Sequence, residues 1–220
     1  MFEHTIEAKW RTMPTSTRRA RERANTRERI IEAALHVLET EGAAALTIRR
    51  IAHDVQYTAP VVYQHFANKD ALVLELVAHG HHLMLTEFRN VLPEPDPDRR
   101  MTRVASEYVR FAGEHPHLYQ VMNDPAIDAD ERRRVAKPAI DALDELLTAW
   151  AAAHDVVLAD SGQACEILWG ALYGIASLGH RDNDRARLLA EQAVRALLLG
   201  WRTEATRHRG SSARRSVSDR

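Results

Sequence analysis

The chain has 220 residues, of which 45% are hydrophobic and 28% charged, and its formal net charge is -1. The longest uncharged run, Ile167 to Gly179, is shorter than the roughly 20 residues that a membrane-spanning helix needs. This composition is typical of a soluble globular protein, and the length suits a small domain fused to a larger one.

The first ten residues, MFEHTIEAKW, lack the basic start and apolar core of a secretory signal, so we expect a cytoplasmic location. Cys165 is the sole cysteine, which excludes an internal disulfide. Because it lies in the apolar pattern CEILWG, we expect it to pack in the core. A redox-sensitive thiol is the alternative.

Charge is distributed unevenly along the chain. Residues 1–70 carry a net charge of +2, residues 71–200 carry -7 and residues 201–220 carry +4, and residues 11–29 hold seven Arg and two Glu. A basic arm on an otherwise acidic chain suits contact with phosphate, although such runs also occur in solvated tails. We assign residues 1–24 to a basic, flexible arm.

Apolar residues at helical spacing predict a first helix from Thr26 to Glu41, ended by Gly42. Its expected buried face comprises Ile30, Ala33, Ala34, Val37 and Leu38. Thr47 is expected to cap a second, short helix that ends near Val55, with Ile48, Ile51 and Ala52 facing inward.

A third short helix is predicted in the stretch VQYTAPVVYQHF, residues 55–66. Thr58 is its expected N-cap, and Pro60 lies in the first turn, where its missing N–H costs nothing. β-Branched residues gain little from intrinsic helix propensity, so packing of Val62 and Phe66 must hold this helix in place.

A fourth, longer helix is predicted from about Asn68 to Asn90, with Leu72, Leu76, His79 and Leu83 on its inner face. The acidic, proline-rich PEPDPD at 93–98 ends it. Further helices are expected at 99–113, 116–122, 127–153, 158–179 and 184–202. No stretch alternates with period two, so we predict an all-α fold, followed by a polar, disordered tail at 204–220.

Two short helices joined by a tight turn fit a helix-turn-helix whose second helix enters the DNA major groove. The apolar anchor would leave the other face of that helix free to meet DNA. A protein-interaction module could use the same geometry, but the neighbouring Arg-rich arm favours nucleic acid.

The stretch LTIRRIAHDVQYTAPVVYQHFANKDAL, residues 46–72, resembles the DNA-binding signature of the tetracycline-repressor (TetR) family. Family members show Leu-Thr-hydrophobic-x-x-Ile-Ala, then Tyr-x-His-Phe, then Lys-(Asp/Glu)-x-Leu. This chain departs from the pattern at Gln56, where a turn Gly is usual, and at Pro60, where Gly or another small residue is usual.

The resemblance implies that Thr47 meets the DNA backbone, that Tyr63 and His65 contact phosphate or base edges, and that Lys69 contacts phosphate. The start of the third helix would face bases through apolar contacts, and Gln64 would suit adenine or simply be solvated. The candidate DNA-binding residues are Thr47, Tyr57, Thr58, Ala59, Pro60, Val61, Tyr63, Gln64, His65 and Lys69.

RFAGEHPHLYQVM (110–122) and ILWGALYGIASL (167–178) resemble the ligand-binding domain of a TetR subgroup with a Trp-x-x-x-His-Gly pattern. Here Tyr173 replaces the His. The resemblance implies a helix-turn-helix domain at 25–70, joined by the long fourth helix to a ligand-binding and dimerisation domain at 71–203.

Aromatic and small residues in that second domain suggest two surfaces. A ligand pocket could be lined by Tyr108, Phe111, Tyr119, Met122, Trp150, Trp169 and Tyr173, although aromatic residues on helices more often form core. A four-helix dimer interface could use Gly170, Gly174, Leu189, Leu197 and Trp201. Alternatively, these two helices complete a monomeric core.

No metal site or cofactor is predicted, since a site at His79 and His82 would need further ligands from elsewhere in the fold. The chain lacks a Gly-rich phosphate loop, HExxH and G-x-S-x-G, so we do not expect an enzyme. We expect a ligand-responsive transcriptional repressor that binds a pseudo-palindromic double-stranded DNA operator as a homodimer and responds to a small, largely apolar effector. The alternative is a helical interaction protein whose Arg-rich arm binds an acidic partner.

Overall fold

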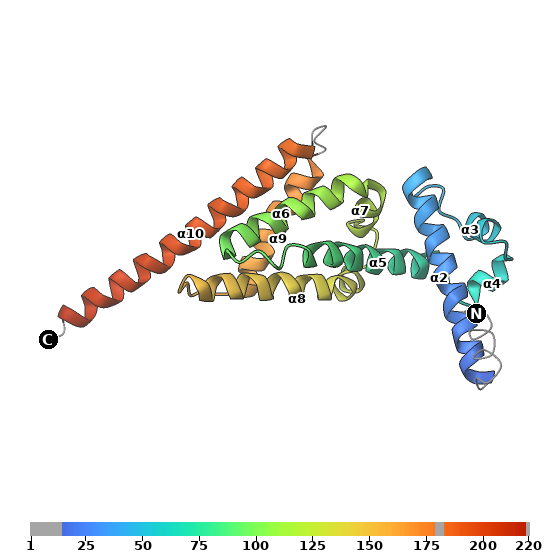
Figure 1. Ribbon diagram of the computed structural model, residues 1–220, viewed down its shortest axis with the longest axis horizontal. Coiled ribbons are helices and arrows are strands. Elements are labelled where there is room, and N and C mark those ends of the chain that lie inside the picture. Colours follow the sequence, from blue (N-terminus) through green and yellow to red (C-terminus); the bar gives the residue numbers. More distant parts are fainter. Residues whose placement is uncertain (1–14, 179–182, 219–220) are drawn as a thin grey trace, which may run out of the picture. The chain divides into compact units, whose positions relative to one another are not determined.

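The structure, a computed structural model, describes residues 15–178 and 183–218, with side chains described at 17–178 and 183–207. These residues form nine α-helices and no strand, so the prediction of an all-α fold is confirmed (Figure 1). The chain divides into two compact units, Met1–Leu76 and Val77–Arg220. The expectations for residues 1–14 lie outside the described part.

Helix α2 (Thr15–Glu41) begins earlier than predicted, so residues 15–24 are helical and do not form a flexible arm. This segment has no Gly or Pro and is rich in Arg, Glu and Ala, which favour helix. An i,i+4 ion pair at 3.6 Å joins Arg18 Nε to Glu22 Oε1. Its described side chains are exposed, and the buried face begins at Ile30.

Helices α3 (Ile48–Asp54) and α4 (Ala59–Tyr63) follow as predicted. The Thr47 side chain caps α3 by accepting a hydrogen bond from the Arg50 backbone N–H at 3.2 Å. Thr58 occupies the N-cap position of α4, but its side chain makes no capping bond. Val62 and Phe66, with exposed fractions of 0% and 3%, anchor α4 as expected.

The turn between α3 and α4 contains Gln56 with a φ of 59°, in the left-handed region. This is the position where the TetR pattern usually has Gly. Gly adopts this conformation freely, whereas a residue with a side chain pays on the order of 1 kcal/mol or more. The departure at Gln56 therefore keeps the turn but strains it.

Helix α5 (Lys69–Arg89) confirms the fourth predicted helix, and Asn68 Oδ1 accepts a hydrogen bond from the Ala71 N–H at its start. The predicted inner face is right at Leu72 and Leu76 and wrong beyond them: His79 is exposed, and His81 is buried instead. The reason is that α5 contributes to the core of one unit up to Leu76 and of the other from Val77 onward. One periodic stripe therefore cannot describe it.

The larger unit adds five helices, namely α6 (Pro97–Glu114), α7 (Pro116–Met122), α8 (Ala129–Ala153), α9 (Ser161–Ser177) and α10 (Asn183–Ser218). Helix α6 contacts all four of the others and forms the centre of the core. Gly80 of α5 lets α7 approach closely, because a Cβ there would lie 2.5 Å from Met122 Sδ.

Helix α10 is longer than predicted and continues to Ser218, past the other helices of its unit (Figure 1). Residues 204–218, predicted to be disordered from their polar composition, are helical. The Thr203 and Thr206 hydroxyls bond to backbone carbonyls four residues earlier, at Leu199 and Arg202. Polar composition alone does not exclude helix when Arg, Ala and Glu contribute to it.

A polar cluster around Asp98 ties α6, α8 and α10 together. The Asp98 carboxylate accepts hydrogen bonds from Trp150 Nε1 at 2.7 Å and from Arg202 NH2 at 2.6 Å, and His154 Nε2 lies 3.3 Å away. Burial acts to raise the Asp98 pKa, but the bonds from Trp150 and Arg202 and the nearby positive charges outweigh it and hold the pKa below its ordinary value.

Replacing Gln56 by Gly should raise the free energy of unfolding by about 0.5–1 kcal/mol, because Gly removes the left-handed strain at some entropic cost. Gln56→Val should lower it by more than 1 kcal/mol, since β-branched residues tolerate this conformation worst. Urea denaturation followed by circular dichroism measures both. A destabilised Gly variant would contradict the assigned backbone conformation.

Asp98→Asn should destabilise the protein at pH 7 by about 1 kcal/mol, a value reduced from that of a buried charged pair because the carboxylate is 39% exposed. The lowered pKa means that this stabilisation is present above the unfolded-state pKa and is lost as pH falls through the folded-state pKa. Urea denaturation from pH 7 towards pH 3 should therefore show the wild type and Asp98→Asn converging. Asp141→Asn, at an exposed pair with Lys137, is the control.

Candidate functional site

The outer face of α4 presents a continuous group of candidate residues. Thr58, Pro60, Tyr63 and Gln64 are exposed, with Tyr63 52% exposed, while Ala59, Val61 and His65 are half-buried. Lys69, the first residue of α5, is exposed as well. The structure thus collects most of the predicted residues around one five-residue helix.

Two of the predicted residues are already engaged in contacts within the protein. The Thr47 hydroxyl caps α3, and the Tyr57 hydroxyl accepts a hydrogen bond from Arg29 NH1 at 2.8 Å. The Arg29 guanidinium also lies over the Tyr57 ring, 5.1 Å from its centroid. Tyr57 therefore positions Arg29 at the start of α4.

Sequence reasoning missed the part that α2 plays beside α4. Arg23 NH2 donates to the Gln64 carbonyl oxygen at 3.4 Å. A hollow of about 600 Å³ separates the two helices and is lined by Glu22, Arg23, Thr26, Tyr57, Val61, Gln64 and His65. Had the first helix been started at Thr15, helical spacing would have placed Arg19, Arg23 and Thr26 on one face.

The charge state of His65 is set by this neighbourhood. Burial, followed by the positive charges of Arg23 and Arg27, lowers the pKa of His65 below its ordinary value. Arg27 is itself held by Glu75, with NH1 to Oε1 at 3.0 Å, and lies over the Phe66 ring. His65 is therefore uncharged at neutral pH in the free protein.

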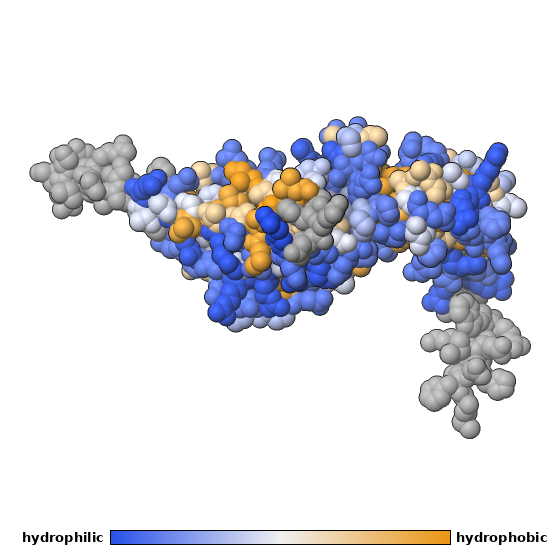
Figure 2. All heavy atoms as spheres, turned by 90° about the horizontal axis from the view of Figure 1, so that it is seen from above, coloured by the Kyte–Doolittle hydropathy of each residue, from blue (hydrophilic) through white to orange (hydrophobic). Residues whose placement is uncertain are grey.

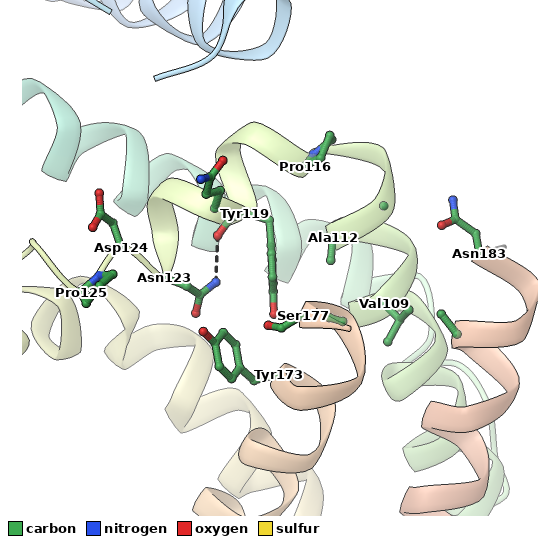
Figure 3. Close-up of a pocket in the computed structure, with 14 residues that line it drawn as sticks. Val109, Ala112, Pro116, Tyr119, Asn123, Asp124, Pro125, Tyr173, Ser177 and Asn183 are labelled. Atoms are coloured by element: carbon green, nitrogen blue, oxygen red, sulfur yellow. Dashed lines mark hydrogen bonds between the residues drawn. The ribbon is translucent and has the colours of Figure 1, made fainter. Parts of the chain in front are cut away.

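A first cavity in the larger unit, of about 570 Å³, lies among α6, α7, α9 and α10 (Figure 3). Tyr119, Tyr173 and Ser177 point towards one another there, and Asn123 Nδ2 donates to the Tyr119 carbonyl oxygen at 2.9 Å. The Tyr108 and Tyr119 hydroxyls lie 3.1 Å apart, and burial raises the pKa of both. The Tyr119 hydroxyl of this cavity is therefore already paired inside the protein.

A second cavity, of about 1080 Å³, is lined by residues of α5, α7, α8 and α9. Met122, Trp169 and Gly170 contribute to it, and so does His81 of α5, which sequence reasoning did not select. His81 could have been selected from the sequence only if the buried face of α5 had been predicted correctly. The predicted face ran through His79 instead.

The predicted pocket residues therefore fall into three groups: those that line the first cavity, those that line the second, and those that line neither. Tyr119 and Tyr173 line the first cavity, and Met122 and Trp169 line the second. Tyr108 connects the two, since it bonds to Tyr119 and packs edge-on against Trp169 at 5.7 Å.

Besides Tyr108, two predicted pocket residues line neither cavity. Phe111 is fully buried against the His115 ring, and Trp150 belongs to the Asp98 cluster with Trp201. Both are core residues, because they face the centre of the helix bundle and not either of the two cavities.

The outward faces of α9 and α10 carry exposed apolar side chains at helical spacing, and we call this surface the α9–α10 face. Figure 2 shows hydrophobic surface on this side of the larger unit. Leu178, Leu188 and Leu199 are 70%, 59% and 64% exposed, and Ile167 is exposed too. Of the predicted interface residues, Gly170 and Gly174 lie exposed, whereas Leu189, Leu197 and Trp201 are half-buried.

Within the described residues, Glu87, Glu114 and His115 bring potential metal-ligand atoms within 4.8 Å of one another. Arg110 already binds both carboxylates, with NH2 to Glu87 Oε2 at 3.2 Å and NH1 to Glu114 Oε2 at 2.5 Å. The guanidinium therefore already occupies both carboxylates of the group. His79 and His82, the pair weighed from sequence, are both exposed.

Two family models match the chain. The model described as bacterial regulatory proteins of the tetR family matches residues 30–76, and the tetracyclin repressor-like C-terminal domain matches residues 101–200. The chain belongs to the TetR family of bacterial regulatory proteins.

Among curated proteins, the chain is similar to the nucleoid occlusion factor SlmA of Vibrio vulnificus, with 27% identity over 113 residues. That match covers 50% of this chain and 58% of SlmA. It does not test the finer assignment to the Trp-x-x-x-His-Gly subgroup, which stays a prediction.

Solved structures share the fold. RolR in complex with resorcinol superposes with a TM-score of 0.67 at 16% identity, covering 86% of this chain and 96% of RolR. FadR from Bacillus subtilis in complex with stearoyl-CoA gives 0.64 at 16% identity, covering 78% and 97%. In the part of the chain that the structure describes, no helix has the length and hydrophobicity to cross a membrane.

Proposed function

We propose that this TetR-family protein binds an operator as a homodimer, with α4 as the recognition helix in the major groove. The observation that carries this proposal is the division of α4 into two faces: Val62 and Phe66 are buried, while Thr58, Pro60, Tyr63 and Gln64 face outward. A helix this short, held rigidly from behind, can enter a groove without rearranging.

The outward residues divide by chemistry. Pro60, Ala59 and Val61 lack side-chain donors and suit thymine methyl groups, while the Gln64 amide suits adenine. Tyr63 and Lys69 suit phosphates, because Lys69 adds a positive charge to the N-terminus of α5, whose N–H groups also attract anions.

His65 offers a titratable contact with the same backbone. A phosphate beside it would favour the charged imidazole, so binding would take up a proton and strengthen as pH falls towards 6. The arginines of α2, above all Arg23 beside Gln64, extend the positive surface around α4.

The α9–α10 face is the proposed dimer surface. Exposed Leu188 and Leu199 would be buried by a second copy, and Gly170 and Gly174 would let its helices approach, since a Cβ at either position meets nothing within 4 Å. The domain assignments follow: residues 25–70 bind DNA and residues 71–203 bind ligand and dimerise.

The larger unit is the proposed sensor of a small, largely apolar effector. RolR and FadR, which share the fold, hold resorcinol and stearoyl-CoA in their structures. The larger unit here has cavities of about 570 and 1080 Å³ that could hold a ligand. An effector that favours the wrong spacing of the two recognition helices must weaken operator binding by linkage. The role that we assign to the protein is that of a cytoplasmic repressor released from its operator by the effector.

Selection of bound fragments from genomic DNA with the purified protein tests this function. A DNA-binding regulator should enrich a pseudo-palindromic sequence and bind it with a steep salt dependence. The alternative, in which the basic N-terminal segment binds an acidic partner, predicts weak retention of fragments without a shared sequence.

Lys69→Ala should weaken binding to any duplex and reduce the slope of log affinity against log salt concentration by about one, because one phosphate contact is lost. Lys137→Ala, which removes an exposed lysine from α8, is the matched control and should leave the slope unchanged. Fluorescence anisotropy with a labelled duplex measures both. An unchanged slope in Lys69→Ala would remove this phosphate contact.

Gly174→Trp should convert the dimer to a monomer and abolish operator binding, since the indole would project into the partner. The monomer fold should survive, because a Cβ at Gly174 meets nothing within 4 Å. Sedimentation reports the oligomeric state, and circular dichroism reports the fold. Thr148→Trp, at an exposed position of α8, is the control. A Gly174→Trp variant that remains dimeric and binds its operator would place the interface elsewhere.

A further inference from the structure

His81 stands apart from the other histidines described. It lies on α5 within the larger unit, only 4% of it is exposed, and it lines the second cavity. Neither ring nitrogen has a hydrogen-bond partner among the described residues. Burial lowers the pKa of His81 to about 4, so the imidazole is neutral at pH 7 and presents one donor and one acceptor.

A second polar group in the same cavity also lacks a partner. Asp144 of α8 lines this space, and its Oδ1 is buried without a hydrogen bond. Burial raises the pKa of neighbouring Cys165, and the negative charges of Asp144 and Glu166 add to the effect. A buried carboxylate oxygen without a partner requires a hydrogen-bond donor, and the carboxylate repels an anion.

The rest of the wall is apolar or balanced in charge. Met122, Ile140 and Trp169 supply apolar surface, and the Trp169 ring lies 6.4 Å from that of His81. A thioether beside an indole favours a flat aromatic guest. The charged side chains that line the cavity are of both signs: Asp130, Arg132, Arg133, Arg134, Lys137, Asp141 and Glu166.

Unpaired buried polar groups are destabilising, and native proteins contain few of them. The three unpaired atoms of His81 and Asp144 need both a donor and an acceptor. A ligand hydroxyl can act as a donor or as an acceptor towards these atoms, whereas a carboxylate ligand supplies acceptors only and would be repelled by Asp144.

We propose that the second cavity binds an uncharged aromatic molecule that carries a hydroxyl group, with His81 and Asp144 as its hydrogen-bonding residues. This inference rests on the proposed function, because it names the chemistry of the effector. The first cavity is the weaker site for such a ligand, since the Tyr119 hydroxyl that lines it is already paired with the Tyr108 hydroxyl.

Calorimetric titration of the full-length protein with three probes tests the proposal. 2-Naphthol offers a donor and an acceptor, 2-methoxynaphthalene keeps the ring and the acceptor but has no donor, and 2-naphthoate is an anion. We expect 2-naphthol to bind at least tenfold more tightly than 2-methoxynaphthalene and 2-naphthoate to show no binding. Equal affinity for the first two probes, or preference for the anion, would overturn the proposal.

His81→Phe should bring the ratio of 2-naphthol to 2-methoxynaphthalene affinity close to one, while its thermal unfolding midpoint stays equal or rises because a buried polar group is removed. His82→Phe, at the exposed neighbouring position, should keep the wild-type ratio. Asp144→Asn, a nearly isosteric change, should admit 2-naphthoate and serves as a second test should His81→Phe misfold. A His81→Phe variant that is folded and keeps the tenfold ratio contradicts the assignment.

Binding of the selected duplex by each variant, measured without probe, separates failure of the ligand proposal from failure of the proposed function. Intact duplex binding with no preference for 2-naphthol rejects the ligand class alone. Loss of duplex binding in the wild type rejects the proposed function.

Discussion

The burial of Val62 and Phe66 is the constraint on which the proposed DNA-binding surface depends. Helix α4 has five residues, fewer than an isolated helix needs to form in water, and two of them are valines. Helix α4 therefore forms because Val62 and Phe66 pack into the core of the smaller unit, with exposed fractions of 0% and 3%. Once the inner face is fixed in this way, the outer residues contribute little to stability, and their identities are free to serve recognition.

Two polar groups in the larger unit show how hydrogen-bond partners, present or absent, lead to different roles. The Asp98 carboxylate is only partly buried, and it is surrounded by Trp150, Arg202 and His154, so its charge holds three helices together. His81 is more deeply buried and has no hydrogen-bond partner among the described residues. A satisfied group stabilises the fold, whereas an unsatisfied one lining a large cavity is suited to a ligand.

The sequence predicted most helices because caps and breaks are local. Thr47, Gly42 and the prolines near 93–98 and at 116 act on adjacent backbone, and their effects are confirmed in α2, α3, α6 and α7. Most of the errors concern which side of a helix is buried and against what. His81 was missed because α5 changes the core it packs against, and Trp150 was assigned to a pocket because hydrophobicity does not reveal which side of a bundle a residue faces. The helical starts and ends at Thr15 and Ser218 were missed because polar composition was given more weight than intrinsic propensity.

The central claim is that the outer face of α4, and not merely the basic surface of α2, meets DNA. Amide hydrogen exchange of the protein with and without its selected duplex tests this most directly, because it reports protection segment by segment. The account predicts that residues 57–66 become protected when the duplex is added, while α8 is unchanged. Protection confined to residues 15–24, with α4 exchanging as in the free protein, would contradict it.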